Sequence, residues 1–132
     1  MIAIQTAFPV VTTTALARVK QFYETLFGFN TVFFDTEFYL HMVSADGNIQ
    51  LGFLMPDLES QPEFLRKAMV PEGYVISFEV KDATAAFEQA QQLNLTIAMS
   101  LKHEVWGQVH FMVTDPAGVN IDIVQHLDAA QA

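Results

Sequence analysis

The sequence predicts an α+β fold made of two βαβββ modules that form a curved mixed sheet around a cavity. Residues 106–123 read as a strand, a tight Asp-Pro-Ala-Gly turn at 115–118 and a second strand, and a shorter version of this ending occurs at 46–53. Each half of the chain also reads as a strand, an amphipathic helix and three strands. One helix covers only one face of such a sheet, so we expect the two modules to join around a shared cavity, a common kind of ligand site.

In the first half, residues 5–11 are apolar and β-rich and predict a strand. Three threonines follow, and any of them can cap a helix. Apolar residues at spacings of three and four predict a helix from Ala15 to Leu26, and Gly28 ends it because glycine best tolerates the left-handed C-cap conformation. Three further strands are predicted at residues 31–35, 38–44 and 49–54.

The second half repeats this order. Residues 74–80 predict a strand, and Asp82 can cap a helix whose apolar side chains run to Leu93. Three more strands are predicted at residues 96–102, 109–114 and 120–125.

The length of 132 residues predicts a single domain. Within it we expect two modules, residues 1–55 and 73–127, joined by a linker at 56–72. The region around this linker carries three prolines and several charges, with a short helix expected around residues 63–69.

Composition excludes several classes of protein. The net charge is −9, from six Lys and Arg against fifteen Asp and Glu, which argues against binding to nucleic acid. Without cysteine, disulfides and thiolate metal sites are excluded. Because no apolar stretch of about 18 residues and no signal peptide is recognised, we expect a cytoplasmic protein that does not bind membranes. The acidic charge either serves solubility or attracts cationic ligands.

Two short motifs carry a resemblance to a known family. The first is Phe22-Tyr23 followed by Leu26-Phe27-Gly28-Phe29, and the second is Trp106-Gly107-Gln108 followed by Asp115-Pro116-Ala117-Gly118. In this order and spacing the chain resembles the vicinal oxygen chelate superfamily, which includes glyoxalases, extradiol dioxygenases, fosfomycin-resistance enzymes and bleomycin-resistance proteins. The resemblance covers nearly the whole chain and implies the fold, but no particular activity, because one fold hosts many functions.

The resemblance also implies where a metal would be held. The family's enzymes use four side chains, one on the first strand (His or Gln) and one on the last strand (Glu) of each module. These positions fall on Phe8 and Gln50 in the first module and on Val75 and Asp122 in the second. Only the Asp122 carboxylate is a good oxygen donor, since Phe and Val have no lone pair and an amide is a weak ligand. We therefore expect no metal and no cofactor, as in the bleomycin-resistance-like branch.

Strand alternation predicts which side chains face the cavity. If Gln50 points inward, so does Leu54, whereas Leu51 and Phe53 face the helix. The same reasoning applied to the other strands gives the predicted ligand-binding residues Phe8, His41, Gln50, Leu54, Val75, Trp106, His110, Met112 and Asp122. This mixed lining suits a flat, partly aromatic organic molecule, whose cationic group would pair with Asp122.

Each candidate also has a structural interpretation. Trp106 would cap the edge of the sheet, Phe8 would fill the cavity, and His110 would be a hydrogen-bonded strand histidine. Gln50 and Asp122 would hydrogen-bond across the module boundary. The remaining alternative is a replacement metal site, formed by His41, His110 and Asp122.

The first functional hypothesis is metal-free, non-catalytic binding of a small aromatic or cationic molecule, in a resistance or sequestration protein similar to the bleomycin-resistance group. The alternative is a metal-dependent lyase, isomerase or dioxygenase of the same fold with an atypical ligand set. A third hypothesis is a collapsed cavity and a role in association. The resemblance further implies a homodimer, and the sequence leaves open whether modules pair within one chain or between chains.

Overall fold

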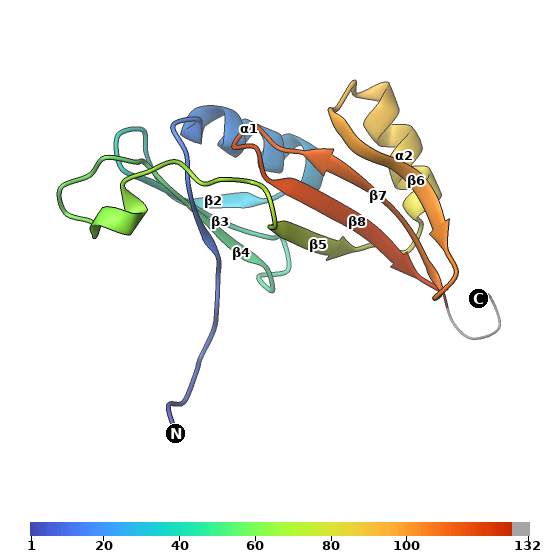
Figure 1. Ribbon diagram of the computed structural model, residues 1–132, viewed down its shortest axis with the longest axis horizontal. Helices are drawn as coiled ribbons and strands as arrows, with labels where there is room; N and C mark the ends of the chain where they lie inside the picture. The colour runs from blue at the N-terminus through green and yellow to red at the C-terminus, as the bar shows by residue number, and fades with distance from the viewer. Residues whose placement is uncertain (128–132) are drawn as a thin grey trace. The chain divides into compact units, whose positions relative to one another are not determined.

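The computed structural model describes residues 1–127 and contains two compact units, the first from Met1 to Val70 and the second from Pro71 onward. Each unit has one four-stranded mixed sheet and one α-helix (Figure 1). The predicted α+β class and the βαβββ order of both modules are confirmed. Neither α-helix in residues 1–127 has the length needed to cross a membrane.

The first unit has the strand order β1-β4-β3-β2, in which β1 runs parallel to β4 and the other neighbours are antiparallel. Its elements are β1 (Val10–Thr12), α1 (Leu16–Phe27), β2 (Asn30–Asp35), β3 (Tyr39–Val43), β4 (Gln50–Leu54) and the 3-10 turn η1 (Glu63–Leu65).

The second unit has the equivalent order β5-β8-β7-β6, with β5 parallel to β8. Its elements are β5 (Val75–Glu79), α2 (Ala83–Gln92), β6 (Ile97–Glu104), β7 (Gln108–Thr114) and β8 (Asn120–His126).

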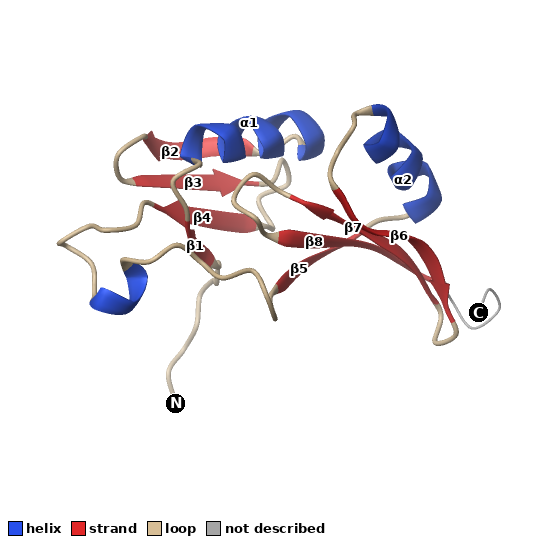
Figure 2. Ribbon diagram, turned by 45° about the horizontal axis from the view of Figure 1, so that its top comes forward, coloured by secondary structure: helices blue, strands red, loops and turns tan. Residues whose placement is uncertain are grey.

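In each unit the helix covers one face of its own sheet (Figure 2). The rings of Tyr23 on α1 and Phe53 on β4 lie 5.6 Å apart, and those of Phe87 on α2 and Phe111 on β7 lie 5.1 Å apart. Tyr23, Phe53 and Phe111 are at most 1% exposed. Burial of such aromatic side chains is the main favourable term in packing each helix onto its sheet.

The two helices begin differently. Asp82 caps α2 as predicted, because its Oδ1 accepts from Ala85 N at 3.0 Å. The threonine cap predicted for α1 is wrong: the N-cap is Ala15, without a side-chain cap. The Thr13 hydroxyl accepts instead from Ala15 N at 3.1 Å, which lies just outside the helix. Gly28 ends α1 in the left-handed conformation, at φ 67°, as predicted.

Residues 56–70, most of the predicted linker, belong to the first unit. The Thr12 hydroxyl donates to Lys67 O at 2.5 Å, and Met69 N donates to Thr12 O at 3.1 Å, so this segment is fixed to the end of β1. The helix predicted around residues 63–69 is wrong in extent, since only the single 3-10 turn η1 forms.

Candidate functional site

The predicted site residues lie on or next to strands of both units, and those on strands point to the face away from the helix. In the first unit, Phe8 precedes β1, His41 is on β3, and Gln50 and Leu54 are on β4. In the second unit, Val75 begins β5, His110 and Met112 are on β7, Asp122 is on β8, and Trp106 is in the turn between β6 and β7. We call this face of each sheet its open face. The pairing of His41 with Gly52 and of Met112 with Asp122 places these residues on it.

A chain of hydrogen bonds crosses the open face of the first unit. Gln50 Nε2 donates to the Thr6 hydroxyl at 3.3 Å, and its Oε1 lies 2.8 Å from His41 Nε2. An amide oxygen only accepts, so His41 Nε2 carries the proton. In a neutral imidazole the other nitrogen is then an acceptor, and His41 Nδ1 receives the Tyr39 hydroxyl at 2.8 Å.

The same face carries a row of aromatic rings. Phe8 meets His41 edge-on, with ring centroids 4.7 Å apart. The His41 and Tyr39 centroids are 5.7 Å apart, and Tyr39 also lies near Phe38 at 5.9 Å and Phe33 at 6.4 Å. We call these five residues the aromatic row. Phe8, Phe33 and Phe38 are 40–47% exposed, so the row offers apolar area to a ligand.

Gly52 is the residue that makes room for Tyr39. A Cβ added at Gly52 would collide with Tyr39 Oη, and it would lie 3.0 Å from Tyr39 Cζ and 3.1 Å from Val10 Cγ2. The phenol therefore lies directly above the backbone of β4. Burial raises the pKa of Tyr39 above its ordinary value of 10.0, which keeps the phenol protonated at neutral pH.

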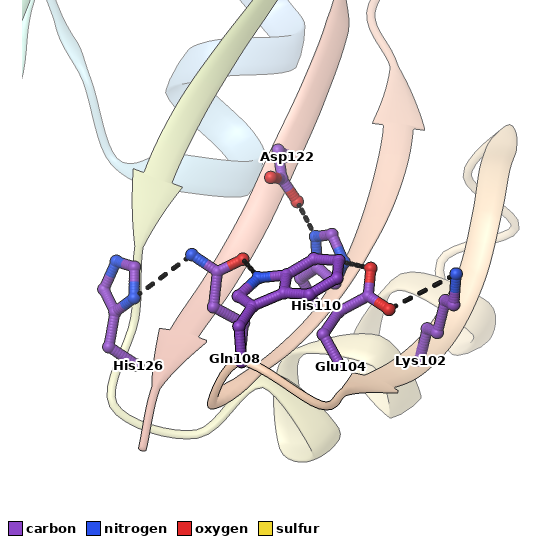
Figure 3. A network of polar contacts seen from close by, with 7 residues as sticks. Lys102, Glu104, Gln108, His110, Asp122 and His126 are labelled. Atoms are coloured by element: carbon purple, nitrogen blue, oxygen red, sulfur yellow. Dashed lines mark hydrogen bonds and ion pairs between the residues drawn. The ribbon is translucent and has the colours of Figure 1, made fainter. Parts of the chain in front are cut away.

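In the second unit, His110 lies between two carboxylates (Figure 3). Its Nδ1 donates to Asp122 Oδ1 at 2.8 Å and its Nε2 donates to Glu104 Oε2 at 3.0 Å. Lys102 Nζ approaches Glu104 Oε1 at 3.3 Å. The side chains of His110, Glu104 and Asp122 are only 8%, 10% and 14% exposed. Because carboxylate oxygens accept from both nitrogens, this geometry favours the imidazolium form.

The pKa shifts of His110 and Glu104 also favour the charged form of each group. Burial disfavours a charged His110, but hydrogen bonds and charges from Glu104 and Asp122 outweigh it and raise the pKa of His110 above 6.5. The hydrogen bond from His110 outweighs the opposing effect of burial and, with Lys102, holds the pKa of Glu104 below 4.5. His110, Glu104 and Asp122 therefore form a charged cluster, which we call the His110 cluster.

A second, more exposed chain of contacts begins at Trp106, which is 64% exposed. The indole Nε1 donates to Gln108 Oε1 at 2.8 Å, and Gln108 Nε2 donates to His126 Nδ1 at 3.3 Å. His126 Nε2 in turn lies 2.9 Å from Glu79 Oε1. Trp106 is thus held by its polar end while its ring stays accessible.

Equivalent positions in the two units follow from strand pairing. The pair before the hairpin turn is Val43 with Gln50 in the first unit and Thr114 with Asn120 in the second. On the parallel side, Thr13 N donates to Leu54 O in the first unit, and Val80 N donates to Val124 O in the second. Both comparisons match the same positions: Gln50 with Asn120, Gly52 with Asp122, and Tyr39 with His110.

This register changes the assignment of the implied metal position in the first module. The register counterpart of Asp122 is Gly52, two residues beyond Gln50. Neither residue supplies a carboxylate: glycine has no side chain, and both polar atoms of the Gln50 amide are engaged.

The residues at the other three implied metal positions are also poor metal ligands. Phe8 and Val75 offer no lone pair, and Asp122 is paired with His110. In residues 1–127, no three or more His, Asp or Glu side chains are grouped so that they could hold a metal ion. Of the alternative metal set, His110 and Asp122 bond to each other within the second unit. His41 bonds to Tyr39 and Gln50 in its own unit.

Comparisons with known proteins identify the family. The family model described as "Glyoxalase/Bleomycin resistance protein/Dioxygenase superfamily" matches residues 5–123. The chain therefore belongs to this superfamily, as the sequence motifs predicted. Among curated proteins, no sequence matches the chain significantly.

Solved structures show the same fold at low identity. A superfamily member from Sphaerobacter thermophilus is 21% identical, with a TM-score of 0.74 over 96% of this chain and 100% of that one. Lactoylglutathione lyase from Agrobacterium tumefaciens is 18% identical, with a TM-score of 0.70 over 93% and 92%. A glyoxalase/bleomycin resistance protein/dioxygenase from Nocardioides is 13% identical, with a TM-score of 0.77 over 99% and 89%.

The sequence did not single out Tyr39 or Glu104. Tyr39 lies two residues from His41, so alternation places it on the same face, and this signal was available. Glu104 comes from the end of β6, across the turn that holds Trp106. Its approach to His110 depends on strand pairing, which the sequence pattern does not specify.

Proposed function

We propose that this protein binds a small aromatic or cationic organic molecule without metal and without catalysis, as a resistance or sequestration protein similar to the bleomycin-resistance group. The aromatic row is the observation that carries the proposal. Its rings lie at contact distances on the open face of one sheet, and three of the five residues keep 40–47% of their surface exposed. Offset and edge-on ring contacts are the usual way in which proteins hold planar ligands.

The chemistry of the family's metal positions supports a metal-free role. At the first-strand positions where the resemblance places the enzymes' donor side chains, this chain has Phe8 and Val75, and the register counterpart of Asp122 is Gly52. The fourth position, Asp122, already balances the charge of His110. An ion held by a single shared carboxylate would lack the three or four protein ligands that catalytic sites normally supply.

The second unit supports recognition of a cationic group. Trp106 offers an accessible ring, and Glu79, which the same chain of contacts links to it, has a side chain that is 73% exposed. Cations bind favourably over an indole ring and near carboxylates. The net charge of −9 adds long-range attraction for such ligands.

Calorimetric titration of chelator-treated protein with bleomycin-type, mitomycin-type and other planar drugs tests the proposal. We expect saturable binding of at least one compound, with the same affinity after metal is added. A Phe8→Ala variant should bind more weakly, whereas Phe64→Ala, which removes an 80% exposed ring outside the row, should not. Failure of every compound in a broad panel would contradict the proposal.

The competing function is a metal-dependent lyase, isomerase or dioxygenase. Elemental analysis of protein purified without chelators distinguishes the two. A stoichiometric divalent metal that disappears in Asp122→Asn would overturn the metal-free proposal.

We also propose a homodimer, which the family resemblance implies, and a cytoplasmic location. Light scattering of the purified chain gives the mass directly: twice 14.8 kDa supports the dimer, and 14.8 kDa contradicts it.

A further inference from the structure

We propose that Tyr39 selects aromatic ligands that carry a hydrogen-bond donor, such as a planar aromatic alcohol or amine. This inference rests on the proposed binding function and names the ligand class of the aromatic row. It follows from the direction of the hydrogen-bond chain in the first unit.

The Gln50 amide sets the direction of donation in this series of hydrogen bonds. The Gln50 amide donates through Nε2 to Thr6 and presents Oε1 to His41. His41 must therefore donate from Nε2, and its Nδ1 accepts the only proton that Tyr39 Oη has. With that proton committed, Tyr39 Oη offers only lone pairs to another molecule.

The position of Tyr39 makes this oxygen useful for recognition. Its ring is in the middle of the aromatic row, between His41 on one side and Phe33 and Phe38 on the other. Gly52 beneath it has no side chain that could compete for the phenol oxygen. Tyr39 is only partly buried. A flat molecule lying along the row can therefore reach an acceptor at its centre.

A ligand whose only polar atom is an acceptor could not form a hydrogen bond with Tyr39 Oη, because neither atom has a proton to donate. A polar group left unpaired in a desolvated site loses affinity, whereas a donor regains the hydrogen bond that it had in water. The row therefore discriminates between ligands of similar shape by a single hydrogen atom.

Two naphthalene probes test this prediction, 2-naphthol with a hydroxyl donor and 2-methoxynaphthalene without one. The affinity of the full chain for each is measured by NMR titration of ¹⁵N-labelled protein. We expect the ratio of affinities, naphthol over methoxynaphthalene, to fall about fivefold in Tyr39→Phe, a change typical of one neutral hydrogen bond. Tyr74→Phe, which alters a tyrosine of the other unit, is the matched control and should keep the wild-type ratio.

Gln50→Leu is the second variant. It leaves Tyr39 in place but removes the acceptor that fixes the proton on His41 Nε2, so the ratio should fall here as well. A role for Tyr39 in packing alone would leave the ratio unchanged in this variant.

The outcomes separate the inference from the function on which it rests. If both probes bind and the ratio is the same in wild type, Tyr39→Phe and Gln50→Leu, the donor selectivity is wrong and aromatic binding stands. If neither probe shifts the spectrum of the wild-type protein, aromatic binding by the row is wrong as well.

Discussion

The two modules have equivalent strand pairing but carry different kinds of side chain at equivalent positions. At equivalent positions the second unit has His110 and Asp122, joined by a 2.8 Å hydrogen bond between charged groups, and the first unit has Tyr39 lying over Gly52. A charge pair in one copy is matched by a ring and an empty backbone position in the other. Duplication of a fold therefore does not duplicate a site, because each copy can carry different side chains at equivalent positions.

The largest expected effect comes from placing the second unit's pair in the first unit. Gly52→Asp alone should reduce the free energy of unfolding by about 3 kcal/mol, because the new side chain collides with Tyr39 and adds a charge to a buried position. Adding Tyr39→His rebuilds the His110–Asp122 pair and should recover at least about 1 kcal/mol. Urea unfolding of the four members of this cycle measures the coupling. A stable Gly52→Asp single variant would show that the two modules are not related in this way.

The next comparison concerns the two histidines. His110→Gln removes the imidazolium that lies between the Glu104 and Asp122 carboxylates, and should cost roughly 1–3 kcal/mol of unfolding free energy. His41→Gln removes hydrogen bonds between neutral, partly exposed groups, and should cost under about 1 kcal/mol. Chemical denaturation of both variants checks the order. Equal losses would mean that the charge of the His110 cluster contributes nothing.

The pH dependence of stability sharpens the same contrast. The raised pKa of His110 gives stabilisation that is complete below 6.5 and lost as pH rises through its folded value. The lowered pKa of Glu104 gives stabilisation that is complete above 4.5 and lost as pH falls through its folded value. The His110 cluster therefore contributes most between pH 4.5 and 6.5.

Thermal unfolding across pH tests this expectation. The wild-type midpoint should fall from pH 6 to pH 8, and the fall should be smaller in His110→Gln. Phe64→Ala, which alters an 80% exposed ring and no ionisable group, serves as the control and should follow the wild-type profile. If His110→Gln shows the same fall as wild type, the raised pKa of His110 is not the cause.

The smallest expected loss of stability comes from removing the side chains at the N-termini of the two helices. Asp82→Ala removes the side-chain cap of α2 and should cost about 1 kcal/mol. Thr13→Ala should cost less, because the Thr13 hydroxyl bonds outside α1 and the N-cap itself is Ala15. Denaturant midpoints of the two variants decide the order, and a larger loss for Thr13→Ala would restore the threonine as the effective cap.

The sequence predicted which face of a strand each side chain occupies, but not which positions along the strands of the two modules are equivalent. Gln50 and Asp122 both follow an isoleucine and precede an aliphatic residue, so their local patterns match. The structure shows that Gln50 corresponds to Asn120 instead. A slip of two residues moves a side chain along the strand without changing its face, so alternation cannot detect it. The two hairpin turns also differ in length by one residue, since Ser44 pairs with Ile49 across four residues and Asp115 pairs with Val119 across three.

The hydrogen-bond partners of the site residues could not be predicted from the sequence either. His110 was predicted on the open face and is there, but its two carboxylate partners come from β6 and β8. The predicted strand at 96–102 ended before Glu104, whereas β6 continues to that residue. Likewise His41 gave no hint of Tyr39 as its proton donor, because a hydrogen bond between side chains two residues apart depends on strand twist and rotamer.

Metal-free binding of an aromatic ligand is tested by an NMR titration of chelator-treated, ¹⁵N-labelled protein with 2-naphthol, repeated after addition of Zn²⁺ or Ni²⁺. We expect saturable shifts at Phe8, His41 and Tyr39 and their neighbours, with the same dissociation constant whether or not metal is present. Binding that requires the metal, or a spectrum that does not change at these residues, would contradict metal-free binding.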